Sequence, residues 1–235
     1  MKMTYNFELD ITTRNSNSVI LKNIKTNSRV LEIGCAHGRM TKYLKEQLGC
    51  TIDIIEKNKN SGYHATEYAR TSILGTKGDI ENKFTIRRLL DANKWQHNTS
   101  TYDYIIFADV LEHLVDPDKV LIKCAKLLET NGMIWISVPN ISHNAVLIDL
   151  LQDKFEYRDL GLLDKTHLKF FTEDSLEKMI DKCGLKVVNK EDLYNAVEYT
   201  EFKNNYDQVP VAVSDYLRNR PNGEVYQFVW GLEKK

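Results

Sequence analysis

The sequence predicts an α/β fold in which a mostly parallel sheet lies between two layers of helices. From residue 18 onward, short apolar runs that suit buried strands alternate with stretches of helical spacing. Such alternation is typical of parallel strands joined by crossover helices, which form a three-layer sandwich. Acidic residues follow several of the apolar runs, at the edge where open α/β sheets bind ligands.

In the first half of the chain, the spacing of apolar residues defines the elements. It predicts a helix over 18–24, a strand over 29–33, a helix over 39–48, a strand over 51–55, a helix over 61–72 and a weak strand over 73–77. The helix over 39–48 illustrates the pattern: its apolar residues recur at helical spacing, at Met40, Tyr43, Leu44 and Leu48.

In the second half, turn and capping residues mark the element boundaries. The pattern predicts a strand over 104–108, a helix over 117–128, a strand over 133–138, a helix over 172–183 and strands over 185–188 and 225–231. Pro117 suits a first helical turn, and Asn131-Gly132 marks a turn. Thr172 begins a capped helix that Gly184 ends.

Composition narrows the class of protein. The chain has 235 residues, 42% of them hydrophobic, and a net charge of −1 from 32 basic and 33 acidic side chains. This content supports one folded core and argues against disorder. It also argues against a nucleic-acid partner, which requires clustered positive charge. No apolar run approaches the roughly 18 to 20 residues of a membrane span, and the polar start does not resemble a signal peptide.

The four cysteines are widely scattered and form no CxxC pair. This spacing argues against a structural zinc site and fits reduced thiols in a cytoplasmic protein. We expect one domain over residues 1–235, with 139–171 inserted as a lid or substrate segment. Val146, Leu147, Leu150 and Leu151 predict a short amphipathic helix there. The segment could cover a substrate, form a homodimer surface or simply pack against the domain.

Acidic residues end four successive strands. The first strand runs through Glu32 into Gly34-Cys-Ala-His-Gly38, the second ends at Glu56, the third at Asp79 and the fourth at Asp109, with Glu112 beyond it. The glycines let a ligand approach the backbone, and a carboxylate after the second strand can accept both hydroxyls of a ribose. An adenosine-type cofactor is therefore predicted.

The position of Glu32 distinguishes a dinucleotide cofactor from a cofactor that carries positive charge. Dinucleotide sites normally read GxGxxG with an acid about 20 residues further on, and Glu56 has that spacing. The turn here is instead Gly34-x-x-x-Gly38, with Glu32 two residues before the first glycine. An acid in that place suits a cationic sulfonium with an ammonium tail better than a pyrophosphate. A nicotinamide oxidoreductase is the disfavoured alternative.

These motifs resemble those of class I S-adenosylmethionine-dependent methyltransferases. The resemblance rests on Val30–Arg39, on Phe107–Leu114 with Asp116-Pro117, and on Leu127–Met133. Residues 137–143 and 157–172 are similar to a bacterial subgroup associated with glycan and cell-surface polysaccharide biosynthesis. The family implies a seven-stranded sheet whose last strand, over about 225–231, is antiparallel.

The resemblance also implies roles for individual residues. Glu32 would face the amino group of S-adenosylmethionine, and Glu56 would hold its ribose hydroxyls. The remaining cofactor contacts would come from Gly34, Ala36, Gly38, Asp79, Ile80, Asp109 and Val110. Many members have glycine where this chain has Ala36.

A hydroxyl acceptor would benefit from a base, for which His143, His167 and His113 are the candidates. His143 ranks first because it follows the fifth strand, and Asp164 could orient His167. For each single histidine, a purely structural role is at least as strong an alternative. We expect no metal site.

The predicted function is therefore methyl transfer, with O-methylation of a sugar or glycan intermediate as the first choice. One alternative keeps the chemistry but changes the acceptor to a quinone, an amine or another small metabolite. Another is a catalytically silent cofactor-binding partner of a glycosyltransferase.

Overall fold

A computed structural model describes residues 9–96 and 101–235. Its strands are β1 (Arg29–Ile33), β2 (Thr51–Glu56), β3 (Thr71–Leu74), β4 (Tyr102–Ala108), β5 (Leu128–Pro139), β6 (Leu185–Lys190), β7 (Leu193–Tyr194) and β8 (Val225–Lys234). They form one sheet in the order β3-β2-β1-β4-β5-β8-β6, with β7 paired to β8. Strands β1 to β5 pair in parallel, and β8 is antiparallel to β5, β6 and β7. The predicted fold class is confirmed, with the short β7 as an addition.

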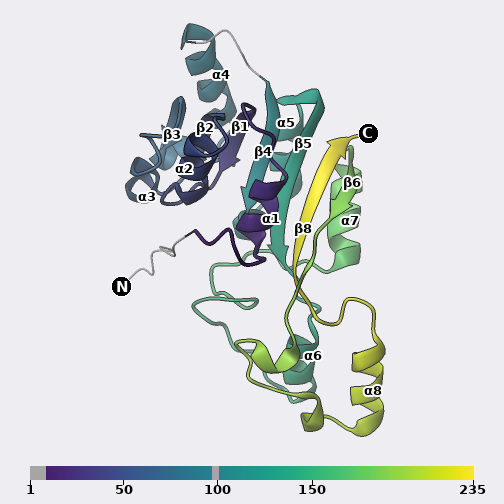
Figure 1. Ribbon diagram of the computed structural model, residues 1–235. Coiled ribbons are helices and arrows are strands. Elements are labelled where there is room, and N and C mark those ends of the chain that lie inside the picture. Colours follow the sequence, from purple (N-terminus) through teal and green to yellow (C-terminus); the bar gives the residue numbers. More distant parts are fainter. Residues whose placement is uncertain (1–8, 97–100) are drawn as a thin grey trace.

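Helices cover both faces of the sheet (Figure 1). They are α1 (Ser16–Lys22), α2 (Arg39–Glu46), α3 (Lys59–Tyr63), α4 (Thr85–Gln96), α5 (Pro117–Ala125), α6 (Asn144–Leu151), α7 (Glu173–Lys182) and α8 (Val211–Asn219), with single turns η1 (Gly75–Gly78), η2 (Leu111–His113), η3 (Val197–Tyr199) and η4 (Tyr206–Gln208). Side chains of α1 and α2 share one core cluster with alternate residues of β1, β2 and β4. Those of α4, α5 and α7 share the other cluster with the intervening residues.

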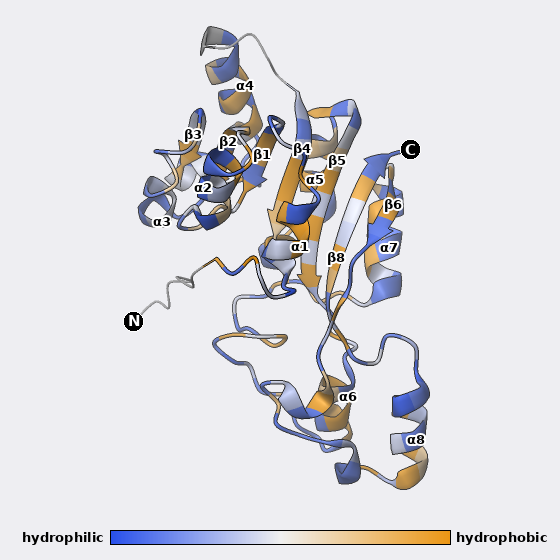
Figure 2. Ribbon diagram, in the orientation of Figure 1, coloured by the Kyte–Doolittle hydropathy of each residue, from blue (hydrophilic) through white to orange (hydrophobic). Residues whose placement is uncertain are grey.

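The central strands β4 and β5 contain long apolar stretches, as Figure 2 shows. Ile105, Phe107, Ile134 and Ile136 are fully buried on one face, and Ile106 is buried on the other. Strands covered on both faces read as continuous apolar runs, which is why the sequence revealed them.

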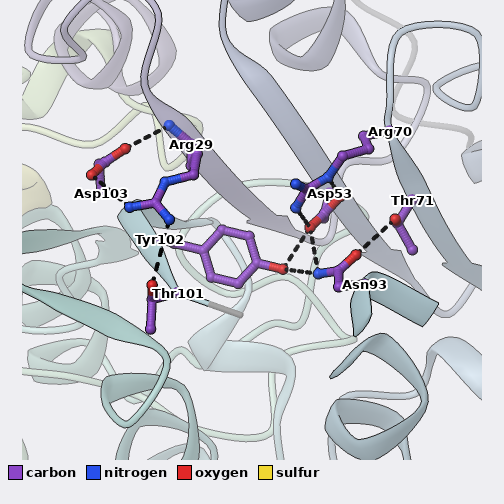
Figure 3. Close-up of polar contacts among 8 residues, drawn as sticks. All are labelled: Arg29, Asp53, Arg70, Thr71, Asn93, Thr101, Tyr102 and Asp103. Atoms are coloured by element: carbon purple, nitrogen blue, oxygen red, sulfur yellow. Dashed lines mark hydrogen bonds and ion pairs between the residues drawn. The ribbon is translucent and has the colours of Figure 1, made fainter. Parts of the chain in front are cut away.

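One helix prediction was wrong, and one helix was missed. The sequence predicted a helix over 61–72, but α3 ends at Tyr63 and β3 begins at Thr71. It assigned no helix to 85–96, where α4 lies. Asn93 of α4 is fully buried and joins a polar network with Asp53, Arg70 and Tyr102 (Figure 3). A polar residue on the buried face obscured the apolar period of this helix.

A second, smaller core lies beyond the carboxyl ends of β4 and β5 (Figure 1). Its buried residues come from α6, from Leu162 and Leu163, and from residues 197–217. We call residues 140–171 and 195–224 together the cap. The sequence indicated only the first of these two segments. No helix among the described residues combines the length and apolar character needed to cross a bilayer.

Candidate functional site

The loop between β1 and α2 is held close to its neighbours by two glycines in the left-handed region. Gly34 and Gly38 have φ of +74° and +75°. A Cβ added to Gly34 would lie 2.6 Å from Cγ2 of Val110, and one on Gly38 would lie 2.6 Å from Cα of Ala65. Gly38 caps α2 without a side-chain acceptor, so the first turn of the helix is available to a ligand. Ala36 also has a positive φ, of +47°.

Glu32 lies beneath this loop and is 4% exposed. The hydroxyl of Thr41 donates to its Oε2 at 2.7 Å. Burial, with a smaller contribution from the charge of Glu56, raises the pKa of Glu32 to about 7. A cation beside this carboxylate would offset the cost of ionising it.

Glu56 connects the end of β2 to the same loop. Its Oε2 accepts the N–H of Ala36 at 3.0 Å, and its Oε1 accepts the N–H of Asn58 at 2.6 Å. Each carboxylate oxygen can accept more than one hydrogen bond, so both retain capacity for a ligand hydroxyl. The carboxylate of Glu56 is therefore a hydrogen-bond acceptor directly beside the loop between β1 and α2.

Asp79 and Ile80 follow β3 on the far side of Glu56. Gly78 is packed so tightly against β2 that a Cβ there would lie 2.4 Å from the carbonyl oxygen of Glu56. Asp79 accepts the ammonium of Lys57 at 2.9 Å and the N–H of Glu81 at 3.1 Å. Ile80 is 5% exposed and belongs to the core, so only a small part of it can face a ligand.

Asp109 directly follows β4 and has a φ of +56°. Its Oδ1 accepts the hydroxyl of Ser137 at 2.7 Å and the amide of Gln227. Val110 follows directly and contacts the position of Gly34. The structure therefore brings the predicted residues of β1, β2, β3 and β4 to one edge of the sheet.

A cluster of Glu112, His113 and His167 lies just beyond Asp109. Glu112 and His113 belong to η2, and His167 comes from the cap. Ligand-type atoms of the three side chains all lie within 4.8 Å of one another, and the imidazole centroids are 4.9 Å apart.

Asp164 orients the backbone of this part of the cap. Its carbonyl oxygen accepts the N–H of His167 at 3.0 Å. Its carboxylate accepts the N–H and the hydroxyl of Thr166, each at 2.7 Å. Asp164 therefore holds the turn that presents His167 to η2.

His143, which ranked first among the candidate bases, is not available to a substrate. It is fully buried and is the N-cap of α6, where its Nδ1 accepts the N–H of Ala145 at 3.1 Å. Its Nε2 lies 2.8 Å from the carbonyl oxygen of Asn195, which can only accept. Both ring nitrogens are therefore used within the fold. Position after the fifth strand predicted the correct edge of the sheet but not the direction of the side chain.

The sequence named Glu112 as an acid at a strand end but gave it no role. The adjacent Glu112-His113 pair was the signal that could have indicated one, since both residues lie in a single turn after β4. The contribution of Thr41 to Glu32 was also missed. It depends on the position of one hydroxyl in α2, which no motif announces.

Comparison with known proteins identifies the family to which this chain belongs. A model described as a methyltransferase domain matches residues 10–190. A ubiquinone biosynthesis O-methyltransferase of Vibrio cholerae is 26% identical over 178 residues, which cover 76% of this chain and 67% of that protein. The enzyme of the same name from Rhizobium leguminosarum is 24% identical over 162 residues, covering 69% and 60%.

Solved structures share the fold at low identity. An S-adenosylmethionine-dependent methyltransferase from Archaeoglobus fulgidus has a TM-score of 0.60 at 17% identity and covers 93% of this chain and 94% of its own. The magnesium protoporphyrin IX methyltransferase of Synechocystis, with S-adenosylhomocysteine bound, has a TM-score of 0.57 at 11% identity and covers 94% and 82%. The matched domain, the strand order and the glycine loop together place this chain in the class I S-adenosylmethionine-dependent methyltransferase family.

Proposed function

We propose that this protein transfers a methyl group from S-adenosylmethionine to a hydroxyl oxygen of a small acceptor of the quinone-precursor type. The carrying observation is the cluster of Glu112, His113 and His167 beside the ligand edge of β4, where an acceptor hydroxyl would lose its proton. The two relatives named above are called O-methyltransferases of ubiquinone biosynthesis, which supports an oxygen acceptor.

The residues around the glycine loop fit the cofactor. Glu32 would pair with its ammonium group, and Glu56 would accept its ribose hydroxyls. Asp79 and Ile80 would border the adenine, while Asp109 and Val110 would close the pocket beside Gly34, Ala36 and Gly38. The support lies in the buried acid at position 32 and in Gly34 and Gly38, where any side chain would clash with its neighbours.

When bound, S-adenosylmethionine supplies a methyl group on a positively charged sulfur. The chain has to hold the acceptor oxygen in line with that methyl group, and positioning of this kind can contribute about 7 to 11 kcal/mol. It must also assist loss of the hydroxyl proton, worth a further factor of about 10² to 10⁴. His113 of η2 and His167 of the cap are half-buried beside Glu112, so we assign this second task to the cluster that these three side chains form.

The cap carries aromatic side chains suited to a planar acceptor. The ring of Phe170 meets the imidazole of His167 edge-on, with 6.3 Å between the ring centroids. Phe155 packs against Tyr157, and both side chains are exposed. The sequence resemblance implied a sugar or glycan acceptor. The named relatives favour the quinone-type alternative instead, and we adopt it.

A transfer assay with methyl-labelled S-adenosylmethionine tests the proposal. The acceptors are a prenylated dihydroxybenzene, a nucleotide sugar and a primary amine, presented separately to the purified protein. We expect label on the dihydroxybenzene, loss of transfer in Glu32→Ala, and unchanged transfer in Glu46→Gln, whose side chain is exposed on α2.

Label on the sugar alone would return the acceptor to the glycan class, and label on the amine alone would reject oxygen chemistry. Binding of S-adenosylhomocysteine without transfer to any acceptor would favour the silent partner of a glycosyltransferase.

A further inference from the structure

Glu112, His113 and His167 have the composition of a metal site that is open on one side. We infer that these three side chains bind one divalent transition-metal ion, for which Zn²⁺ is the best match, and that the ion holds the acceptor hydroxyl. The ion's role in transfer rests on the proposed function, whereas the site itself does not. Metal bonds of about 2.1 Å place neighbouring ligand atoms roughly 3 to 4 Å apart. Because the three ligand atoms already lie within 4.8 Å of one another, small side-chain rotations would close the site.

The tautomer of His113 leaves the correct nitrogen free. Its Nδ1 lies 3.2 Å from both the carbonyl oxygen and the hydroxyl of Thr166. The hydroxyl already donates to Asp164 at 2.7 Å, and a carbonyl can only accept. Nδ1 of His113 must therefore carry the proton, and the lone pair is on Nε2.

His167 has the same arrangement. Its Nδ1 lies 3.3 Å from the carbonyl oxygen of Leu162, so this nitrogen also carries the proton and Nε2 keeps its lone pair. An imidazole that donates to a backbone carbonyl and presents its other nitrogen is the usual form of a metal-binding histidine. Two such rings beside one carboxylate make the resemblance to a metal site specific.

Glu112 supplies the negative charge and lacks a partner for it. It is 1% exposed, and its buried Oε2 has no hydrogen-bond partner. An unpartnered buried carboxylate oxygen is costly unless something positive is bound to it. A cation shared with the two imidazoles would remove that cost.

Backbone contacts fix the cluster across two parts of the fold. The carbonyl oxygen of Glu112 accepts the N–H groups of Leu168 at 2.7 Å and Lys169 at 3.0 Å. His167 therefore lies against η2, although its neighbour Thr166 and the contacting His113 are 53 positions apart in the chain. A bound ion would join the cap to the sheet at the site where the acceptor enters.

Two imidazoles and one carboxylate select for borderline transition metals over Mg²⁺ and Ca²⁺, which prefer oxygen ligands throughout. Three protein ligands leave coordination positions for the acceptor, as in catalytic zinc sites. A hydroxyl held by the ion would release its proton to water more readily. Its oxygen would then form the new bond to the methyl carbon, while the electron pair of the broken carbon–sulfur bond stays on sulfur.

Metal binding is measured first, without cofactor or acceptor. The protein is stripped with a chelator and titrated calorimetrically with Zn²⁺ and, separately, Mg²⁺. We expect one Zn²⁺ per chain and at least 100-fold weaker Mg²⁺ binding. Glu112→Gln and His167→Asn should each weaken Zn²⁺ binding at least 100-fold, whereas His64→Asn, which removes an exposed imidazole, should leave it unchanged.

Each result decides the inference. Zn²⁺ stoichiometry far below one, or equal affinity in the wild type and both site variants, overturns it. If Glu112→Gln fails to fold, as judged by its thermal transition, His167→Asn carries the comparison because that side chain is only half-buried. Stoichiometric Zn²⁺ binding without methyl transfer would retain the site and reject the proposed function. Methyl transfer by a stripped protein that binds no Zn²⁺ would retain the proposed function and reject the metal site.

Discussion

At the scale of single residues, the site depends on groups kept in costly states. Glu32 is buried with a pKa near 7, and Ala36 and Asp109 have positive φ without being glycine. Strained backbone and buried charge are typical of ligand sites, where ligand binding offsets their energetic cost. A bound ammonium group would do this for Glu32.

The raised pKa of Glu32 makes stability depend on pH. Because the folded pKa of about 7 lies above the unfolded value of 4.5, folding favours the protonated form. The stability gained from this proton is complete below pH 4.5 and is lost as the pH rises to 7. Urea unfolding of the wild type and Glu32→Gln should therefore diverge, with the variant gaining about 2 kcal/mol relative to the wild type between pH 5 and 8. A constant difference across that range would contradict the assigned pKa.

Gly38 should tolerate a methyl group less well than a glycine with the same backbone conformation in open space. Gly38→Ala places its Cβ against the backbone of Ala65, whereas Gly184 has a φ of +74° and nothing within 4 Å. Gly184→Ala should cost about 1 kcal/mol from conformation alone. Gly38→Ala should cost at least 1 kcal/mol more in chemical denaturation. Equal costs would mean that the loop relaxes freely.

At the scale of elements, a buried polar network fastens α4 and the β3 edge to the sheet. Arg70 donates to Asp53 at 2.5 Å, and the hydroxyl of Tyr102 donates to the same carboxylate at 2.6 Å (Figure 3). Asn93 bridges Asp53, Tyr102 and Thr71. The network holds β2 in place near the β3 edge of the sheet. Glu56, at the end of β2, contacts the loop between β1 and α2.

Removing one hydroxyl from this network should be measurable. Tyr102→Phe deletes a donor to Asp53 and an acceptor for Asn93 while it keeps the ring, so we expect a loss of about 1 to 3 kcal/mol in the free energy of unfolding. Tyr194→Phe in β7 is the matched control, because that side chain is 69% exposed and should change stability little. A Tyr102→Phe variant as stable as the control would mean that the network is dispensable.

The same elements show what sequence can and cannot predict. The strands β1, β2, β4 and β5 were recognisable because helices cover them on both faces, which requires apolar residues throughout. Helix α4 was missed because Asn93, which donates a hydrogen bond to Asp53, interrupts the apolar face of the helix. The strand-end acids were predicted because chain order fixes which edge they share. His143 was misjudged because the direction of a side chain depends on the packing of Asn195, which is distant in sequence.

At the scale of the whole molecule, the cap and the sheet are separate cores that meet at the site. Asn144 joins the two segments of the cap, since its amide donates to the hydroxyl of Tyr206 and the carbonyl of Leu217 at 2.9 Å. Its Oδ1 accepts the guanidinium of Arg220 at 2.8 Å. We therefore expect the cap to loosen as a unit of its own, before the sheet does.

Hydrogen exchange should reveal this division. Asn144→Ala is expected to speed amide exchange at least tenfold in α6 and α8, because buried partners lose their bonds, and to leave β1 and β4 protected as in the wild type. Asn219→Ala, which removes an exposed amide from α8, should change neither region. Equal loss of protection in the sheet would show that cap and sheet unfold as one unit.

The account as a whole depends on one ligand, so calorimetric binding of S-adenosylhomocysteine tests it most directly. We expect one molecule per chain in the wild type, binding at least tenfold weaker in Glu56→Gln, and unchanged binding in Glu46→Gln. Absence of binding in the wild type, or tight binding of NADH in its place, would contradict the assignment of the glycine loop to this cofactor.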